Sequence, residues 1–159
     1  MGMLPLAILA GGSGTRLGDR TRHLAKALVP VAGKPFIAHQ LTLARREGVQ
    51  HVVVTHAMQA PVEMTIPQMQ EAARAGAYIE FVYGGLVGQK PAFQIGDYAK
   101  AIRAVGPASC ILSSDLGQPA NPLHPDGLAA FFQALRNEGF SQSEIDLMSK
   151  TNPARALGL

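Results

Sequence analysis

Apolar residues along this chain follow two different spacings. Short continuous apolar runs are typical of strands that are buried on both faces of a sheet, and they predict strands near residues 6–10, 51–55, 78–82 and 109–112. Between the runs, apolar residues recur every three or four positions, which predicts helices near residues 36–44, 65–75, 95–102 and 125–135. Residues 141–148 and 152–157 are expected to add two short helical segments.

Several of these helices carry start and stop signals. Thr65 with Gln68, and Ser141 with Glu144, have the residue types and the three-residue spacing of a capping box. Gly76 follows the first of these helices, where a glycine favours the backbone conformation that ends a helix. The boundaries therefore have local chemical support as well as periodicity.

The order of the elements predicts the fold class. Strands that alternate with helices indicate parallel pairing through right-handed crossovers. We therefore predict an α/β fold, a small parallel sheet of about four strands flanked by helices, as in Rossmann-like three-layer proteins. The alternative is a half (β/α) barrel completed by dimerisation, because an unfinished curved sheet leaves open edges. A length of 159 residues suits a single α/β domain over residues 1–159.

Composition narrows the classes of function. Apolar residues make up 47% of the chain and charged residues 16%, which indicates a globular protein. The net charge of +3 is too small to indicate a nucleic-acid partner. One cysteine, Cys110, excludes an internal disulfide. We find no signal peptide and no apolar segment long enough to span a bilayer, so we expect a cytoplasmic protein without a membrane partner.

Polar clusters fall after the predicted strands. Gly11 to Arg16 follow the first, His56 the second, Gly84 to Gly88 the third and Asp115 the fourth. Ligands of parallel α/β sheets bind at the carboxyl ends of the strands. The clusters therefore predict a site at one edge of the sheet.

The first cluster is a glycine-rich turn that suits an anion. Its backbone N–H groups could surround a phosphate, with positive charge added by Arg16 and Lys26. It is neither a P-loop, which needs a Lys followed by Ser or Thr, nor the dinucleotide fingerprint, because Leu17 stands where a third glycine is required. These residues alone leave two alternatives, an anion site or a plain strand-ending turn.

The longer string decides between them. Gly11 to Leu17 read GGSGTRL, and Thr21, the run KALVPV at residues 26–31 and Pro35 follow. Residues 1 to about 55 thus resemble the sugar nucleotidyltransferases, although Ala25 stands where a proline is usual. The resemblance implies a nucleoside triphosphate and a sugar phosphate as substrates, with Mg²⁺ as cofactor. It implies Arg16 and Lys26 as catalytic residues and assigns nucleotide binding to Leu9, Ala10, Gly11, Gly12, Gly14, Thr15, Arg16 and Lys26.

The rest of the chain resembles a different family. From about residue 55 to 159 it is similar to the C-terminal part of metal-dependent amidohydrolase barrels, on the run ILSSDLGQ at 111–118 and the tail at 152–155. That resemblance implies His56 and Asp115 as metal ligands, with Zn²⁺ or Mn²⁺. Asp115 also stands where nucleotidyltransferases hold Mg²⁺. From the residues alone, Asp115 could equally cap a loop, and His56 could be a solvated strand-end histidine.

The two resemblances place a junction near residues 52–56. We therefore expect a nucleotidyltransferase-like protein, and we keep two alternatives: a hydrolase-like remnant, and a folded chimera without catalytic activity. A homodimer is compatible with either fold.

Overall fold

The computed structural model describes residues 17–19, 29–60, 62–88 and 90–159. The chain divides into two compact units, one formed by residues 1–50 with 60–62 and the other by residues 51–59 with 63–159. The strand predicted near residues 6–10 lies outside the described residues.

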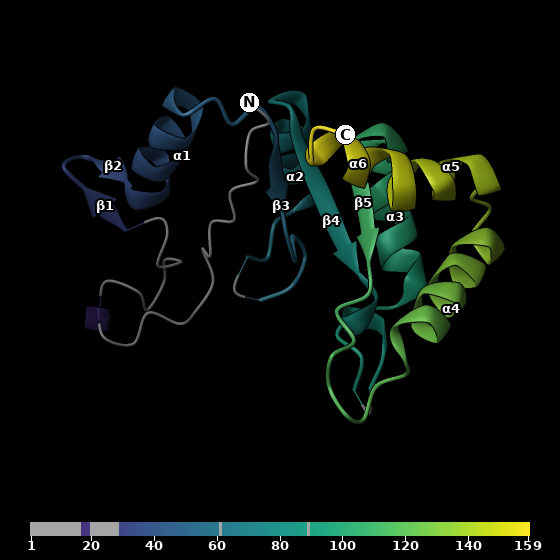
Figure 1. Ribbon diagram of the computed structural model, residues 1–159. Helices are drawn as coiled ribbons and strands as arrows, with labels where there is room; N and C mark the ends of the chain where they lie inside the picture. The colour runs from purple at the N-terminus through teal and green to yellow at the C-terminus, as the bar shows by residue number, and fades with distance from the viewer. Residues whose placement is uncertain (1–16, 20–28, 61, 89) are drawn as a thin grey trace. The chain divides into compact units, whose positions relative to one another are not determined.

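The first unit contains a β-hairpin followed by a helix. Strands β1 (Pro30–Val31) and β2 (Lys34–Pro35) pair antiparallel (Figure 1). Ala32 and Gly33 form the turn between them, both with positive φ angles of 48° and 77°. Two-residue hairpin turns of this kind match the natural twist of the strands. The periodicity of the sequence did not predict this hairpin.

Helix α1 (Phe36–Arg46) confirms the helix predicted near residues 36–44. The imidazole Nε2 of His39 lies 2.9 Å from the carbonyl oxygen of Val31, which connects the helix to the hairpin. Gly48, with a φ of 85°, donates its N–H to the carbonyl oxygen of Arg45 and ends the helix.

The second unit is built on a parallel sheet of three strands, in the order β3 (Val52–Val54), β4 (Ala77–Val82) and β5 (Cys110–Ser113). Val54 pairs with Ile79, and Ile79 pairs with Cys110, so the strands are in parallel register. Figure 1 shows their arrowheads at the same end of the sheet. The predicted α/β class, a parallel sheet flanked by helices, is confirmed.

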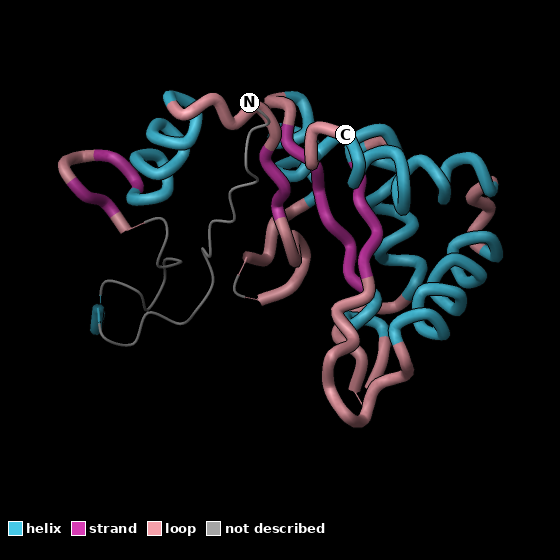
Figure 2. Tube along the Cα trace, in the orientation of Figure 1, coloured by secondary structure: helices cyan, strands magenta, loops and turns pink. Residues whose placement is uncertain are grey.

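Helices connect and extend these strands (Figure 2). Helix α2 (Ile66–Arg74) joins β3 to β4, and α3 (Ile95–Val105) joins β4 to β5. Helix α4 (His124–Asn137) follows β5. Short 3₁₀ turns, η3 (Tyr83–Leu86) and η4 (Pro107–Ser109), stand at the end of β4 and before β5.

Both predicted capping boxes are present. Gln68 accepts from the Thr65 N–H at 2.8 Å, and Glu144 accepts from the Ser141 N–H at 2.8 Å. These bonds satisfy backbone donors that the first turn of a helix leaves without partners.

The core of the second unit lies between the sheet and the helices. Ile79 and Phe81 of β4 point to one face with Cys110 and Leu112 of β5, because alternate strand residues share a face. The ring of Tyr98 from α3 lies 5.4 Å from that of Phe81, nearly edge to face. The same cluster takes in buried side chains from four further helical segments, namely Met69, Phe131, Leu135, Ile145 and Met148.

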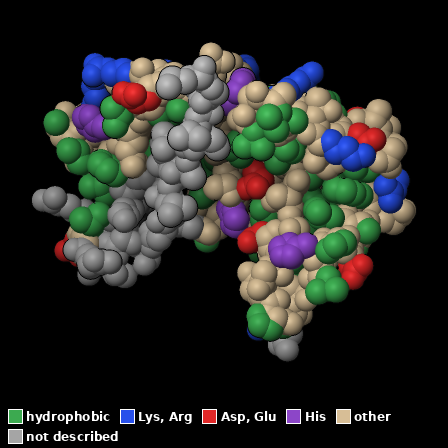
Figure 3. All heavy atoms as spheres, in the orientation of Figure 1, with side chains coloured by type: hydrophobic (Ala, Val, Ile, Leu, Met, Phe, Trp, Pro, Cys, Tyr) green, Lys and Arg blue, Asp and Glu red, His purple; other side chains and the backbone are tan. Residues whose placement is uncertain are grey.

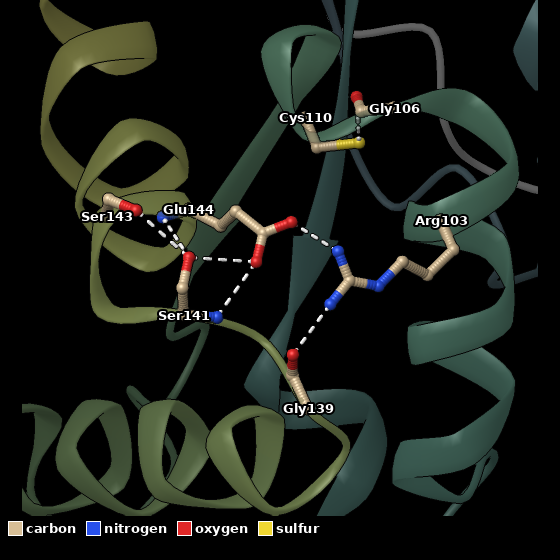
Figure 4. Close-up of polar contacts among 7 residues, drawn as sticks. All are labelled: Arg103, Gly106, Cys110, Gly139, Ser141, Ser143 and Glu144. Carbon is tan, nitrogen blue, oxygen red and sulfur yellow. Dashed lines mark hydrogen bonds and ion pairs between the residues drawn. The ribbon is translucent and has the colours of Figure 1, made fainter.

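Three short helical segments end the chain: α5 (Gln142–Asp146), the π-helix η5 (Leu147–Thr151) and α6 (Asn152–Ala156). Arg103 binds the segment that leads into them, by pairing with Glu144 and donating to the Gly139 carbonyl oxygen at 2.9 Å (Figure 4). Asn152 is fully buried and donates to the carbonyl oxygens of Pro107 (2.9 Å) and Cys110 (2.8 Å). Arg103 thus joins the C-terminal helices to α3, and Asn152 joins them to η4 and β5.

Across the described ranges, no helix is long and apolar enough to cross a membrane.

Candidate functional site

The carboxyl ends of the three parallel strands bring polar residues together, as the sequence predicted. The loops after β4 and β5 meet there, where the Gly84 N–H donates to the Ser114 carbonyl oxygen at 2.9 Å. In Figure 1 these loops lie below the arrowheads of β4 and β5. The turn after β3 supplies Thr55 and His56.

The central contact joins His56 to Asp115. The Nε2 atom of His56 lies 3.1 Å from Oδ2 of Asp115, although 59 residues separate them in the sequence. The two side chains are 38% and 43% exposed, so a ligand could reach them. Figure 3 shows histidine and acidic side chains close together near this end of the sheet.

Both residues have left-handed backbone. The φ angle is 55° at His56 and 49° at Asp115. This region costs roughly 1–2 kcal/mol for most residues and persists where the surroundings impose it. Asp and His adopt this conformation more readily than most residues, and Ala32 and Glu63 have it as well, so it fixes the path of the two loops without by itself marking a site.

Two hydroxyl groups fix the imidazoles at this edge. Thr55 Oγ1 lies 2.7 Å from Nδ1 of His56. Ser114 Oγ lies 2.7 Å from Nδ1 of His124, the first residue of α4. Our sequence reasoning did not include Thr55, Ser114 or His124 among the site residues. Their signal was proximity to the predicted strand ends, but hydroxyl residues are too common there to be singled out.

Gly84 and Gly85 let the loop after β4 approach this site. A Cβ atom on Gly84 would lie 2.7 Å from the carbonyl oxygen of Asp115 and 3.2 Å from its Oδ2. A Cβ atom on Gly85 would meet the side chains of Gln59 and Tyr98. The predicted glycine loop is therefore a close-packing element beside Asp115.

Tyr98 of α3 lies beside the loop after β4, next to Gly85. Its hydroxyl donates to the Val82 carbonyl oxygen at 3.1 Å. Burial raises the pKa of Tyr98 to about 12, and the nearby charge of Asp115 adds to the increase. The phenol therefore stays protonated at neutral pH and serves as a hydrogen-bond donor rather than a base.

The described residues contain one carboxylate at the centre of this site. Nowhere in the described part of the chain do three or more His, Cys, Asp or Glu side chains gather as a metal cluster. Two of the predicted site residues, His56 and Asp115, are brought together. The others lie outside the described residues, namely Leu9, Ala10, Gly11, Gly12, Gly14, Thr15, Arg16 and Lys26.

Comparison with known families gives an independent result. The sequence profile of the nucleotidyl transferase family matches residues 6–115, which is more than half of the chain and spans both compact units. The matched range extends on both sides of the junction predicted near residues 52–56. It gives the amidohydrolase resemblance and the chimera no support.

Curated relatives agree with this match. The chain is 32% identical over 125 residues to a glucose-1-phosphate thymidylyltransferase of Xanthomonas campestris pv. campestris, a match that covers 76% of this chain and 38% of the relative. It is 40% identical over 47 residues to a mannose-1-phosphate guanylyltransferase of Mycobacterium tuberculosis, which covers 30% of this chain and 13% of the relative. The chain thus spans less than two thirds of the length of these relatives. No solved structure matches it significantly.

Proposed function

Because the chain belongs to the nucleotidyl transferase family, we propose that it binds a nucleoside triphosphate and transfers the nucleotidyl group to a sugar 1-phosphate. The observation that carries the proposal is the run GGSGTRL at residues 11–17 within the matched range. Two relatives are a glucose-1-phosphate thymidylyltransferase and a mannose-1-phosphate guanylyltransferase, which supports a sugar 1-phosphate as acceptor.

The glycine-rich turn is assigned to the triphosphate. In our proposal the backbone of Gly11, Gly12 and Gly14 binds the phosphates, with Leu9, Ala10 and Thr15 beside the nucleotide. Arg16 and Lys26 neutralise the negative charge that develops on the leaving group, because guanidinium and ammonium groups bind phosphate oxygens strongly.

The proposed reaction is one displacement at phosphorus. An oxygen of the sugar 1-phosphate attacks the α-phosphorus of the triphosphate, and a new P–O bond forms as the α–β phosphoanhydride bond breaks. The electron pair of the broken bond leaves with pyrophosphate. Such a transfer requires positioning and charge neutralisation rather than a covalent protein intermediate.

Asp115 fits a magnesium site. Mg²⁺ prefers one or two carboxylates together with water and phosphate oxygens. Asp115 offers an accessible carboxylate at the carboxyl end of β5, and among the described residues its Oδ1 has no hydrogen-bond partner. Zn²⁺ usually requires three or four protein ligands, and the described residues do not supply such a set. When bound, Mg²⁺ would neutralise phosphate charge.

Isothermal titration calorimetry tests the proposal directly. The full chain is titrated with each of the common nucleoside triphosphates, with and without Mg²⁺. We expect heat with at least one triphosphate when Mg²⁺ is present, and loss of that heat in Arg16→Ala. Release of pyrophosphate with a panel of sugar 1-phosphates then identifies the acceptor. Absence of heat with every triphosphate would contradict the proposal.

A second candidate function is a metal-dependent hydrolase. It rests on the approach of His56 to Asp115 at the carboxyl ends of the parallel strands, but the described residues supply no third metal ligand and the family match does not support it. It predicts stoichiometric Zn²⁺ or Mn²⁺ in the purified protein. Elemental analysis that finds neither metal would count against it, and a chain with no activity in either assay would favour the inactive chimera.

The cytoplasmic location and the homodimer stay predictions from the sequence.

A further inference from the structure

We propose that His56 is a positioning residue that holds the Asp115 carboxylate in place for the cation that accompanies the triphosphate. The inference rests on the function proposed above and assigns a role to a side chain outside the glycine-rich signature. It differs from the ligand role that the sequence suggested for His56, because the histidine acts on the carboxylate rather than on the metal.

The contact with Asp115 requires a proton on one particular ring nitrogen of His56. An ionised carboxylate can only accept, so the 3.1 Å contact with Asp115 Oδ2 requires a proton on Nε2. The other ring nitrogen, Nδ1, lies 2.7 Å from Oγ1 of Thr55, so both nitrogens of His56 have a hydrogen-bond partner.

Both ring nitrogens of His56 are occupied by these two contacts. A histidine that ligates a metal needs one nitrogen with a free lone pair, and its second nitrogen usually donates to a carboxylate or carbonyl group. In this arrangement the nitrogen opposite the carboxylate is bound to the Thr55 hydroxyl instead of facing open space. The geometry suits a group that orients a ligand residue.

Asp115 is held from two sides. His56 binds Oδ2, and Gly84 packs so closely that a Cβ atom there would lie 3.2 Å from the same oxygen. The Gly84 N–H also donates to the carbonyl oxygen of the preceding residue, Ser114 (2.9 Å). These contacts restrict Oδ2 and leave Oδ1 as the oxygen available to a cation.

The turn that carries His56 is itself fixed. The carbonyl oxygen of His56 accepts from the Gln59 N–H at 2.9 Å. The carbonyl oxygen of the fully buried Ala57 accepts from the Met64 N–H at 2.8 Å. These bonds hold the turn in which His56 has a φ of 55° and its imidazole contacts Asp115.

A matched pair of variants isolates the hydrogen bond. His56→Gln keeps an amide donor that can reach the position of Nε2, whereas His56→Asn carries the same amide on a side chain one methylene shorter. Asparagine also tolerates left-handed backbone, so His56→Asn should fold. The Mg²⁺ dissociation constant is measured by calorimetry in the presence of the triphosphate that the wild-type chain binds.

We expect His56→Asn to raise that dissociation constant by about tenfold, as losses of residues that orient a metal ligand commonly do. His56→Gln should stay within about threefold of the wild-type value. Circular dichroism spectra of both variants check that they fold. Equal affinity of His56→Asn and the wild type would overturn the positioning role.

A second readout does not require metal or nucleotide. Long-range ¹H–¹⁵N spectra of the metal-free chain should show a proton on Nε2 of His56, the nitrogen that faces Asp115. An Nε2 without a proton in the wild type would overturn the proposal. A wild-type chain that binds no triphosphate would overturn the proposed function and the role of His56 with it. If the wild type binds triphosphate and Mg²⁺ tightly and His56→Asn binds them equally well, only the role of His56 is overturned.

Discussion

The guanidinium carbon of Arg103 lies 3.7 Å from the centroid of the Phe140 ring. The same guanidinium pairs with the Glu144 carboxylate and donates to the Gly139 carbonyl oxygen, so one side chain of α3 contacts two residues between α4 and α5 and one residue of α5. These contacts join the start of the C-terminal helices to α3 (Figure 4).

Replacing Arg103 should loosen those contacts. We expect Arg103→Met to lower the free energy of unfolding by about 1–2 kcal/mol, because it removes a cation–π contact and charge-assisted hydrogen bonds from a side chain that is only partly buried. Urea unfolding followed by circular dichroism measures the change. Arg103→Lys keeps the charge without the planar fork and should lie between wild type and Arg103→Met. Equal stability of all three chains would contradict the assignment.

Glu144 should make stability depend on pH in a defined window. The Ser141 N–H and the Arg103 guanidinium hold the pKa of Glu144 below its ordinary value of 4.5. A carboxylate with a lowered folded pKa stabilises the fold fully above its unfolded pKa, and this contribution is lost as the pH falls through the folded pKa.

The comparison that isolates Glu144 is with Glu144→Gln, which keeps a capping side chain without the charge. We expect the wild type to be the more stable at pH 7 and the difference to shrink progressively below about pH 4.5. Urea unfolding at pH 7, 5 and 3 measures both chains. A difference that stays constant over this range would rule out the ionised carboxylate as its source.

Gly84→Ala should disturb Asp115. The added Cβ would lie 2.7 Å from the Asp115 carbonyl oxygen, which is closer than real Cβ contacts, so the loop or Asp115 must move. We expect Gly84→Ala to weaken Mg²⁺-dependent triphosphate binding more than it lowers the free energy of unfolding. Gly117→Ala is the matched control, because a Cβ at this nearby position meets nothing within 4 Å. Equal binding by the two variants would show that close packing at Gly84 does not position Asp115.

A negative charge in place of the Asn152 amide should destabilise the fold. This amide donates to two carbonyl oxygens in a fully buried position, and a carboxylate there would face those oxygens without a donor. We expect Asn152→Asp to lower the free energy of unfolding by about 3–5 kcal/mol at pH 7. Asn152→Ala, which loses only the hydrogen bonds and some packing, should cost about 1–3 kcal/mol. Urea unfolding ranks the variants, and the reverse order would contradict this account.

Cys110 should be unreactive in the folded chain. Burial raises the pKa of its thiol to about 12, and the thiol donates to the Gly106 carbonyl oxygen at 3.3 Å. Because the thiolate is the reactive form, we expect slow labelling by Ellman's reagent at pH 8 and rapid labelling in urea. The chain has one cysteine, so the signal has a single source. Rapid labelling of the native protein would mean that β5 is accessible.

The local elements could be predicted because their signals are local. The capping boxes at Thr65 and Ser141 lie within one turn of backbone and formed as expected. The hairpin at residues 30–35 was not predicted, because its strands have two residues each and no periodicity to detect. The helix predicted near residues 95–102 does begin at Ile95, but its capping box was not predicted, since Gln94 is not a usual capping residue.

The sequence by itself determined the α/β class, the parallel order of strands and helices, and a family signature in its first residues. Only the tertiary structure decided that His56 meets Asp115, that Gly84 packs beside them, and that Arg103 reaches Glu144. The physical reason is that periodicity specifies the face on which a residue lies but not the distant partner that it meets there. That partner is selected by strand order, loop path and packing of the whole unit.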